Sequence, residues 1–579
     1  MTPPNGRPHA DDCSFRILRK NAVFAVVIAV IALILLCGLA GKMIVQRNAS
    51  ADHASTFGAD GYVRSASYFG DEWHINFWNS EMEHLERDMK QIREDGFDSV
   101  ILVIPWKEFQ PSVEPVAYSD YAFDQLDRVM NAAGGAGLKV YARVGYMWDF
   151  VNDADEDIHE RIIRLFHDHG TRNAWREYLR ALYQHLSRHA CFAGGFLTWE
   201  DYMPPFLGFS DAPSLQDRID AAKRMGFQEH VRSQYALTDY NKAFNLQYSS
   251  YENIPYPRRS EPAMRAMYDF FDRSLNRLLA DGQTVFPNLS MEVRLDGDPL
   301  FDAKGNPNGY YKHEATFPCQ QSDYTAAMYG IPMDFVNNGE RVKAKEALRH
   351  TADILRFLAR HNDGKPVYIE QFLYYDNTPK FEHNARLEDG EIGTYLLTCP
   401  DVLRKYSAGY GVWTYRDYYD NRLYNNGFFL RERGWETEGN VAFEKTGDST
   451  VCRLTAPALL RQQIPDVRDK QDEPELTVSF EVTECAESNT ITVIMGPQRQ
   501  KVTVDHPGVY RTVFSRQGKE KIRLFALEVE NGTLTVDNLR LYSHIQNGLL
   551  YDPDNRPLEQ RDNLRKMNEL LAGQQNDAP

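Results

Sequence analysis

The chain has 579 residues, a formal net charge of −17 at pH 7 and 12% aromatic residues. This length excludes a single small domain, and the aromatic content excludes a mostly disordered chain. The acidic balance excludes capture of nucleic acid by a basic surface, so we expect a neutral or cationic partner and no nucleic-acid partner.

Residues 21–41 carry no charge and are almost all apolar. At about 1.5 Å per residue this run is about 31 Å long, which matches the hydrocarbon core of a bilayer. A cleaved signal peptide is the alternative, but its apolar core normally covers only about 7–15 residues. We therefore predict an uncleaved transmembrane helix over residues 21–44.

The basic residues around this helix predict its orientation. Three of them lie directly before the apolar run 21–41 and two lie soon after that run, namely Arg16, Arg19 and Lys20, and then Lys42 and Arg47. Because Lys and Arg are enriched on the cytoplasmic side, we expect a single-pass protein with residues 1–20 in the cytoplasm and the remainder in the periplasm or outside the cell. Residues 1–47 carry a net charge of +4 and the other 532 residues carry −21, so the exported part is the acidic part.

Residues 45–66 are small, polar and unpatterned, which predicts a linker. After the linker, short apolar runs alternate with amphipathic helical stretches, the pattern of repeated βα units. Eight strands are expected, near residues 74–78, 97–105, 138–144, 192–199, 289–295, 324–329, 366–371 and 409–415. Residues 201–260, rich in Tyr and Pro, resemble an insertion.

This pattern predicts a (β/α)₈ barrel over residues 67–431. An open doubly wound sheet is the alternative. Against it, no strand runs into a glycine-rich phosphate-binding turn.

The composition changes near Gly434, and between residues 476 and 542 six short alternating strands are separated by Gly, Pro and Asp-rich turns. They predict an antiparallel, jelly-roll-like β-sandwich over residues 432–545. The tail, residues 546–579, contains one amphipathic stretch at Leu558–Leu571. The sandwich resembles carbohydrate-binding modules in length, although packing against the barrel is an equally good role.

The seven cysteines are widely spaced, which indicates neither a zinc site nor a redox dithiol. Cys452 and Cys485 could pair in an oxidising compartment, whereas buried free thiols are the expected state for most of the others.

Two acids lie at the ends of otherwise apolar strands: Glu200 in FLTWE and Glu370 in VYIEQF. An acid in a buried strand is costly unless it is solvated, paired or used in chemistry. Since the carboxyl ends of barrel strands form the active site, two acids there suit glycoside cleavage. For Glu200 the alternative is a cap of the following helix.

At this point the chain resembles clan A of the glycoside hydrolases, which are (β/α)₈ barrel enzymes. Glu200 matches the acid/base glutamate that ends the fourth strand of the clan, and Glu370 matches the nucleophile that ends the seventh. Residues 84–111 resemble the early βαβ segment and residues 411–418 resemble the eighth strand. The clan usually has Asn directly before the acid/base glutamate, and this chain has Trp199.

Five further residues are predicted to bind substrate: Trp413, Tyr329, Trp199, Arg143 and Asp417. Trp413 would form part of the sugar-binding floor, or belong to the core. Tyr329 would donate to the nucleophile as a clan tyrosine does. Arg143 would orient a carboxylate or bind an acidic sugar, with a structural ion pair as the alternative. Asp417 lies in a run rich in Asp, Asn, Arg and Tyr that suits a carbohydrate rim. Loop residues His313 and Glu314 match no metal motif.

The resemblance implies a membrane-anchored retaining hydrolase of an extracytoplasmic polysaccharide that needs no metal or organic cofactor. Glu200 would begin protonated, with its pKa raised by Glu370, and Glu370 would form the glycosyl-enzyme intermediate. The alternative is a non-catalytic glycan-binding or scaffold protein of an envelope polysaccharide machine.

Overall fold

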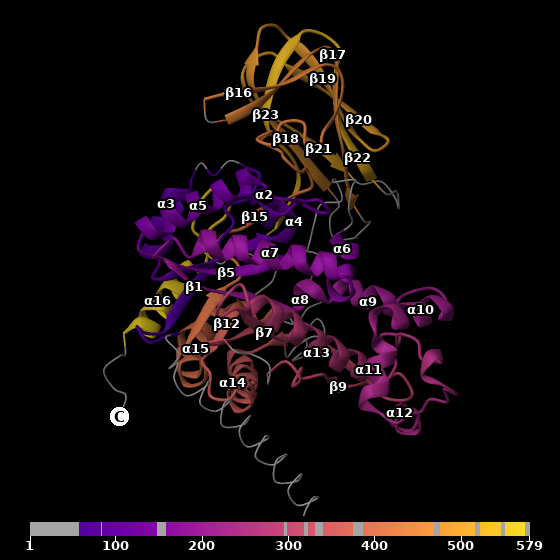
Figure 1. Ribbon diagram of the computed structural model, residues 1–579. Helices are drawn as coiled ribbons and strands as arrows, with labels where there is room; N and C mark the ends of the chain where they lie inside the picture. The colour runs from indigo at the N-terminus through magenta and orange to yellow at the C-terminus, as the bar shows by residue number, and fades with distance from the viewer. Residues whose placement is uncertain are drawn as a thin grey trace, which may run out of the picture. The chain divides into compact units, whose positions relative to one another are not determined.

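The computed structural model describes residues 57–80, 82, 84–146, 158–294, 298–317, 322–330, 340–374, 386–447, 449–467, 475–515, 522–545 and 550–573. Its first domain is a closed barrel of eight parallel strands in the order β1-β14-β12-β10-β7-β6-β5-β2 (Figure 1). The strands are β1 (Val63–Ser67), β2 (Ser99–Pro105), β5 (Lys139–Tyr146), β6 (Phe192–Leu197), β7 (Ser290–Val293), β10 (Thr325–Gly330), β12 (Val367–Leu373) and β14 (Gly409–Val412). The predicted (β/α)₈ barrel is confirmed, and the open-sheet alternative is wrong.

The first strand differs from the prediction. The apolar run near residue 74 is a helix, α2 (His74–Phe77), and all of β1 except Ser67 lies in the stretch expected to be a linker. β1 has the sequence VRSAS, and it is fixed as a strand by parallel pairing with β14 on one side and β2 on the other. Tertiary pairing therefore overrides its weak strand propensity.

Helices connect the strands, and short two-stranded pairs decorate the loops. The connecting helices are α3 (Leu85–Glu94), α4 (Trp106–Phe109), α5 (Asp120–Gly135), α6 (Ile158–His167), α7 (His169–Leu186), α13 (Met264–Gln283), α14 (Ala344–His361) and α15 (Ile392–Tyr406). The pairs are β3 (Ser112–Val113) with β4 (Val116–Ala117), β8 (Pro299–Phe301) with β9 (Pro307–Tyr310), and β11 (Arg341–Val342) with β13 (Arg386–Leu387).

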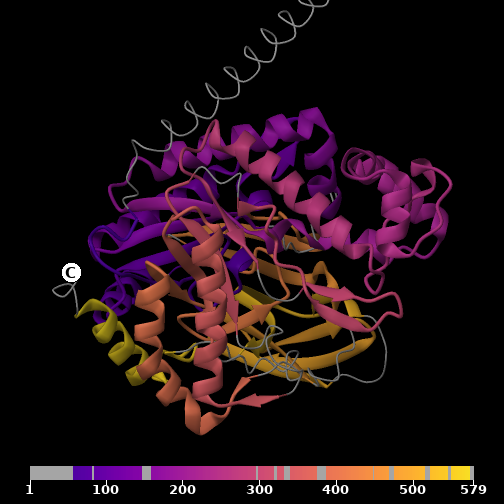
Figure 2. The ribbon, with the colours of Figure 1, turned by 90° about the horizontal axis from the view of Figure 1, so that it is seen from below.

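The expected insertion after β6 is helical. It contains α8 (Trp199–Tyr202), α9 (Pro204–Ser210), α10 (Leu215–Met225), α11 (Phe227–Gln234) and α12 (Leu237–Phe244). In Figures 1 and 2 the magenta helices α10 to α12 stand out from the barrel wall.

The barrel interior is filled by a layer of large rings. Phe57, Tyr141, Phe196, Tyr324 and Tyr368 form a buried cluster, with ring centroids 4.6 Å apart for Phe57 and Tyr324 and 5.1 Å apart for Tyr141 and Tyr368. Tyr141 and Tyr368 each lie two residues before a polar side chain considered below. The layer therefore closes the barrel from beneath and keeps water away from the groups above it.

The second domain is a nine-stranded antiparallel sheet. Its strands are β15 (Tyr418–Asn421), β16 (Glu436–Thr446), β17 (Ser449–Val467), β18 (Glu475–Cys485), β19 (Asn489–Met495), β20 (Gln498–Val504), β21 (Gly508–Ser515), β22 (Ile522–Val529) and β23 (Thr533–Ile545). The six strands expected from residue 476 onward are confirmed, whereas β16 and β17 were missed. β15 lies within the residues predicted for the barrel but pairs with β23. Cys452 and Cys485 are both free thiols, so their pairing is wrong.

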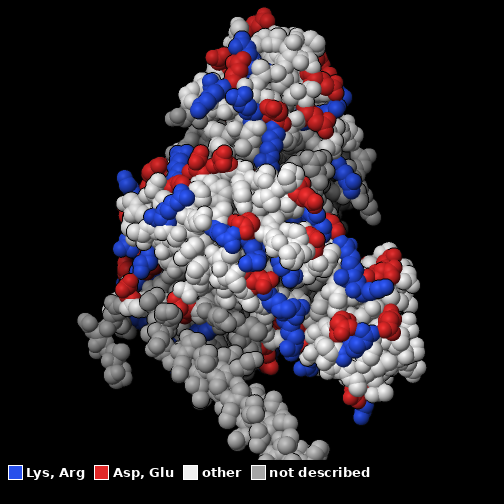
Figure 3. All heavy atoms as spheres, in the orientation of Figure 1, with Lys and Arg blue, Asp and Glu red and all other residues white. Residues whose placement is uncertain are grey.

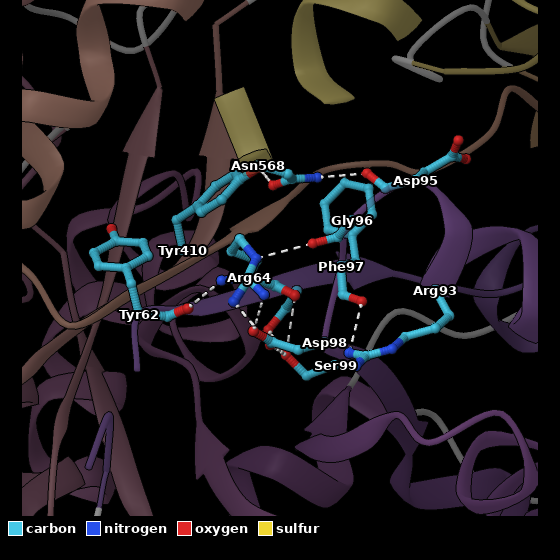
Figure 4. A network of polar contacts seen from close by, with 11 residues as sticks. Tyr62, Arg64, Arg93, Asp95, Gly96, Phe97, Asp98, Ser99, Tyr410 and Asn568 are labelled. Atoms are coloured by element: carbon cyan, nitrogen blue, oxygen red, sulfur yellow. Dashed lines mark hydrogen bonds and ion pairs between the residues drawn. The ribbon is translucent and has the colours of Figure 1, made fainter. Parts of the chain in front are cut away.

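The C-terminal tail packs against the barrel. Helix α16 (Arg561–Ala572) returns to the barrel, where Leu564, Met567 and Leu571 join the barrel core. Asn568 accepts a hydrogen bond from the Tyr410 hydroxyl at 2.5 Å and donates to the Asp95 carbonyl at 2.9 Å (Figure 4). Residues 550–573 are thus part of the first domain, which the sequence did not reveal.

The predicted membrane helix at residues 21–44 lies outside the described residues. Within the described ranges, none of the helices is long and apolar enough to cross a bilayer.

Candidate functional site

Polar side chains gather where the barrel strands end. Arg143 lies on β5, Glu200 and Asp201 follow β6, and Glu292 and Arg294 lie on and directly after β7. Glu370 and Gln371 lie on β12. Because the carboxyl ends of parallel barrel strands meet at one face, residues far apart in sequence form one site there.

Glu200 lies in the first turn of α8, directly after β6. The helix is capped by the side chain of Thr198, which accepts a hydrogen bond from the Asp201 backbone N–H at 3.3 Å. Thr198, and not Glu200, therefore caps this helix, so the alternative reading of Glu200 as a helix cap is wrong. Its side chain is 28% exposed, whereas that of Asp201 is fully buried.

Arg143 is the centre of the site. Its guanidinium is 2% exposed and donates to both carboxylate oxygens of Asp201, at 2.6 and 3.1 Å. It also donates to Gln371 Oε1 at 3.2 Å and to Glu200 Oε2 at 3.4 Å. Glu200 therefore shares one guanidinium with Gln371, the residue that directly follows Glu370.

Glu200 has a second cationic partner. Arg294 lies 3.6 Å from its Oε1 and places its guanidinium over the ring of Trp199, 5.7 Å from the ring centroid. Both contacts of Glu200 are longer than the 2.6 Å contact between Arg143 and Asp201. Glu200 is therefore held between two arginines, but more loosely than Asp201.

Glu370 occupies an irregular point of β12. Ala327 of β10 pairs with Ile369, but the next residue of β10 pairs with Gln371, so Glu370 is the extra residue of a bulge. Bulges redirect side chains next to active sites. Glu370 is 1% exposed, and its Oε1 has no hydrogen-bond partner among the described residues.

The protonation of the two glutamates differs from the expectation. Burial alone would raise the pKa of Glu200, but Arg294 and Arg143 outweigh it and hold that pKa below its ordinary value. Burial, followed by the charge of Glu292, raises the pKa of Glu370 well above its ordinary value. The prediction that Glu200 begins protonated is therefore wrong for the free protein, because two guanidinium groups face it.

Glu292 is a residue of this site that the sequence analysis missed. It is fully buried, and burial raises its pKa to about 8. The signal was present, because Glu292 interrupts the apolar run of a predicted strand in the same way as Glu370. A third acid within a predicted barrel strand could have indicated that Glu292 belongs to the site.

An aromatic wall adjoins Arg143. Its guanidinium lies 5.3 Å from the ring centroid of Tyr146 and 5.8 Å from that of Trp413. Trp413 is 8% exposed, and its ring centroid lies 4.9 Å from that of His74. Burial, followed by the charge of Arg143, lowers the pKa of His74 well below its ordinary value. His74 is thus a neutral ring of the wall, and sequence patterns gave no sign of it.

Trp199 is turned into the protein. It is 3% exposed, and its indole N–H donates to Asp272 Oδ1 at 3.1 Å. His313 lies between two carboxylates, with Nδ1 2.9 Å from Asp272 and Nε2 2.8 Å from Asp298. Burial would lower the pKa of His313, but the two aspartates raise it to about 10. A buried imidazolium therefore fixes the residue that stands before Glu200.

The structure places the last two predicted site residues as follows. Tyr329 lies on β10, and its side chain is outside the described part of the chain. Asp417 is 4% exposed, and its backbone N–H donates to the Tyr551 carbonyl at 2.9 Å, so it joins the barrel to the returning tail. Among the described residues, no group of three or more His, Cys, Asp or Glu side chains is arranged to hold a metal ion.

No protein-family model matches this chain, and no curated protein does. Solved structures do. One is the exo-beta-1,4-mannosidase Op5Man5 from Opitutaceae bacterium strain TAV5, with 14% identity over 62% of this chain and a TM-score of 0.39; the match spans 53% of that enzyme's length. A second is a GH5_18 protein from Bifidobacterium longum subsp. infantis, with 17% identity over 64% of this chain and 73% of that chain, and a TM-score of 0.38. A third is a GH5_18 protein from Streptomyces cattleya in complex with GlcNAc, with 16% identity over 63% of this chain and 73% of that chain, and a TM-score of 0.39.

Proposed function

We propose that this chain is a membrane-anchored retaining glycoside hydrolase that cleaves O-glycosidic bonds of an extracytoplasmic polysaccharide. The observation that carries the proposal is the meeting of Glu200 and the Glu370–Gln371 segment at the buried guanidinium of Arg143. Two carboxyls from the fourth and seventh strands at one end of a closed barrel suit double displacement at a sugar carbon.

Glu370 is the proposed nucleophile. Its carboxylate attacks the anomeric carbon and displaces the leaving sugar, whose oxygen takes a proton from Glu200. Glu200 then removes a proton from water, which attacks the anomeric carbon and releases Glu370. Gln371 and Asp201 hold Arg143 in place beside Glu200.

Glu200 must acquire its proton before the first step. It is ionised in the free protein, but its contacts with Arg143 and Arg294 are long, at 3.4 and 3.6 Å, and 28% of its side chain is exposed. A sugar that displaces Arg294 and covers Glu200 would remove a cation and solvent together, and both changes raise the pKa of a carboxyl. Substrate binding and proton uptake by Glu200 are therefore coupled in this proposal.

The substrate class follows from charge. On the face shown in Figure 3, acidic and basic side chains are interspersed, and the whole chain carries −17. An acidic protein disfavours polyanionic substrates, so a neutral polysaccharide is proposed. The name of the Opitutaceae enzyme, a beta-1,4-mannosidase, adds β-mannans to the panel for testing. We also propose that the anchor predicted at residues 21–44 holds the barrel in the periplasm or outside the cell, where an exopolysaccharide assembly machine would be a partner.

The test is incubation of the detergent-solubilised full chain with bacterial exopolysaccharides, plant glucans and β-mannans. We expect reducing ends from the wild type, a loss of about a thousandfold or more in Glu370→Gln, and normal rates in Glu86→Gln, a matched change at an exposed position of α3. Early ¹H NMR spectra should show product with the anomeric configuration of the substrate.

Equal product release from wild type and Glu370→Gln would refute the nucleophile, and an inverted product would refute the retaining mechanism. Binding of a polysaccharide without any release of sugar would favour the scaffold alternative.

A further inference from the structure

A second cavity lies where the barrel meets the sheet of the second domain. Its volume is about 470 Å³, within the range of about 300–1,000 Å³ that is usual for small-molecule sites. The barrel contributes the segment Tyr68–Glu72 after β1, and the sheet contributes side chains of β18, β21 and β23. Arg143, Glu200 and Glu370 are not among its lining residues. This junction cavity is therefore separate from the site at the strand ends.

The two walls of the junction cavity are fixed to each other. β15, which directly follows the barrel, pairs with β23 of the sheet. The Tyr419 backbone N–H donates to the Asp71 carbonyl at 2.8 Å, and the Glu72 carboxylate pairs with the guanidinium of Arg540 on β23. A cavity between walls that are already joined is formed before a ligand arrives, so binding does not have to order a loop.

The sheet wall is polar because side chains alternate along a strand. Phe480 of β18 points into the core of the second domain, so Ser479 and Glu481 point to the opposite face, toward the cavity. The register places Arg511 of β21 and Arg540 of β23 on either side of Ser479. Two guanidinium groups, a hydroxyl and a carboxylate therefore lie close together on this wall.

Most charges of the junction cavity are already matched. Five acids and four arginines line it, namely Asp71, Glu72, Asp88, Glu481 and Asp554, and Arg87, Arg416, Arg511 and Arg540. The ion pairs join Asp71 and Glu72 to Arg540, Asp88 to Arg87 and Arg416, and Asp554 to Arg556. Among the described residues, Arg511 and Glu481 alone stand outside these pairs, and Arg511 is exposed. One cation and one anion thus remain, which gives no net preference for a charged ligand.

The remaining groups suit a ligand rich in hydroxyls. Uncharged side chains that donate and accept hydrogen bonds continue along the wall, among them Ser479, Asn538 and Asn555. A hydroxyl can donate to a carboxylate and accept from a guanidinium or an amide, so a chain of sugar units satisfies both kinds of group. The rings of Tyr419 and Tyr542, with centroids 4.6 Å apart, add the apolar surface on which the C–H face of a sugar packs.

We propose that the junction cavity is a second binding site, which takes a neutral oligosaccharide without cleaving it. Arg511 donates to sugar hydroxyls and Glu481 accepts from them. The cavity residue Glu72 directly precedes Trp73 and His74, and the His74 ring belongs to the aromatic wall beside Arg143. One short segment therefore connects the two sites. The binding itself does not depend on the proposed function; only its use, to hold a polysaccharide near the cleft, rests on that function.

The first test maps where a sugar binds. The detergent-solubilised full chain is mixed with hexasaccharides of β-1,4-glucan, β-1,3-glucan and β-1,4-mannan, each with a photoreactive diazirine at one end, and is then irradiated and digested. We expect mass spectrometry to find the label on peptides that contain residues 68–72, 479–481 or 509–511. Absence of label from all these peptides with every neutral hexasaccharide would overturn the proposal. Stronger label there from an anionic oligogalacturonide would overturn the neutral class.

The second test changes the two unmatched charges together. In the double variant Arg511→Ala, Glu481→Gln, we expect binding of the labelling hexasaccharide to weaken by about tenfold or more, because hydrogen bonds to charged groups are lost. The fold should persist, since Arg511 is exposed and the new amide oxygen still accepts from Asn538. The matched control is Arg499→Ala, Glu528→Gln, which removes an exposed ion pair outside the cavity and should bind as the wild type does.

The outcomes separate this proposal from the proposed function. Equal binding and equal label in the wild type and in the Arg511, Glu481 double variant would refute the second site. Slower hydrolysis of a small aryl glycoside by this variant, at an unchanged urea midpoint, would place Arg511 and Glu481 in the catalytic cleft and refute it too. A wild type that hydrolyses nothing but carries the label at the junction cavity would refute the proposed function and support the second site.

Discussion

Replacement of Arg143 by Met should strongly destabilise the barrel. The guanidinium is 2% exposed, and its loss leaves the fully buried carboxylate of Asp201 without its two hydrogen bonds. Removing one partner of a buried ion pair costs about 3–5 kcal/mol, because the other charge remains buried and uncompensated. At lower pH Asp201 can take up a proton and become neutral, so the loss of unfolding free energy should be smaller near pH 5 than near pH 8.

The measurement is urea unfolding of the full chain, followed by tryptophan fluorescence at both pH values. Asp201→Asn should recover part of the loss in the Arg143→Met background, with a coupling of about 2 kcal/mol in the double-mutant cycle. Arg349→Met is the control, because its contact with Glu346 is exposed and 3.7 Å long, and it should cost less than about 1 kcal/mol. If Arg143→Met costs no more than this control, or if the two site mutations are additive, the buried pair does not have the strength argued here.

Two further predictions concern stability against pH. His313 has a folded pKa of about 10, raised by Asp272 and Asp298 against the effect of burial. The folded protein therefore holds a proton that the unfolded chain releases near pH 6.5, and the free energy of unfolding should fall by about 1.4 kcal/mol per pH unit from about pH 6.5 to 10. This slope, measured as the change of urea midpoint, should be missing in His313→Gln, and its persistence there would refute the assignment. Glu72, paired with Arg540 between the barrel and β23, has its pKa raised to about 7, chiefly by burial. Because the folded pKa is raised, the free energy of unfolding should fall as the pH rises from about 4.5 to 7. Glu72→Gln should remove that fall, while the urea midpoint at pH 4 stays within experimental error. An unchanged dependence of the urea midpoint on pH in Glu72→Gln would show that Glu72 is ionised in the fold.

The sequence predicted most of the barrel because its buried parallel strands are continuous apolar runs, as in β2 and β12. β1 was not predicted because VRSAS has no such run. Its position depends on pairing with β2 and β14, which begin at residues 99 and 409. Helix α16 escaped for a related reason: an amphipathic pattern shows that a helix has a buried face, but not that α15 covers it.

Within the site, position in the fold predicted Glu200 and Glu370, but not their protonation. Strand ends can be located along a sequence, whereas the partners across the barrel cannot. Arg294 and Arg143 reverse the expected pKa of Glu200, and their contacts arise from β5 and β7, more than 50 residues away on either side. The same limit applied to Glu292, whose meaning depends on Glu370 being close by.

The charges of the site, taken together, bear on the reaction proposed. Arg143 and Arg294 face Glu200 and Asp201, and Glu292 and Glu370 are two further buried acids of the same site. The charges of the site lie above a buried layer of rings, where charge is poorly screened. Sugar cleavage develops positive charge at the anomeric carbon in its transition state. A fixed negative charge that is present before the sugar arrives stabilises that state without reorganisation, and it opposes sugars that carry carboxylates.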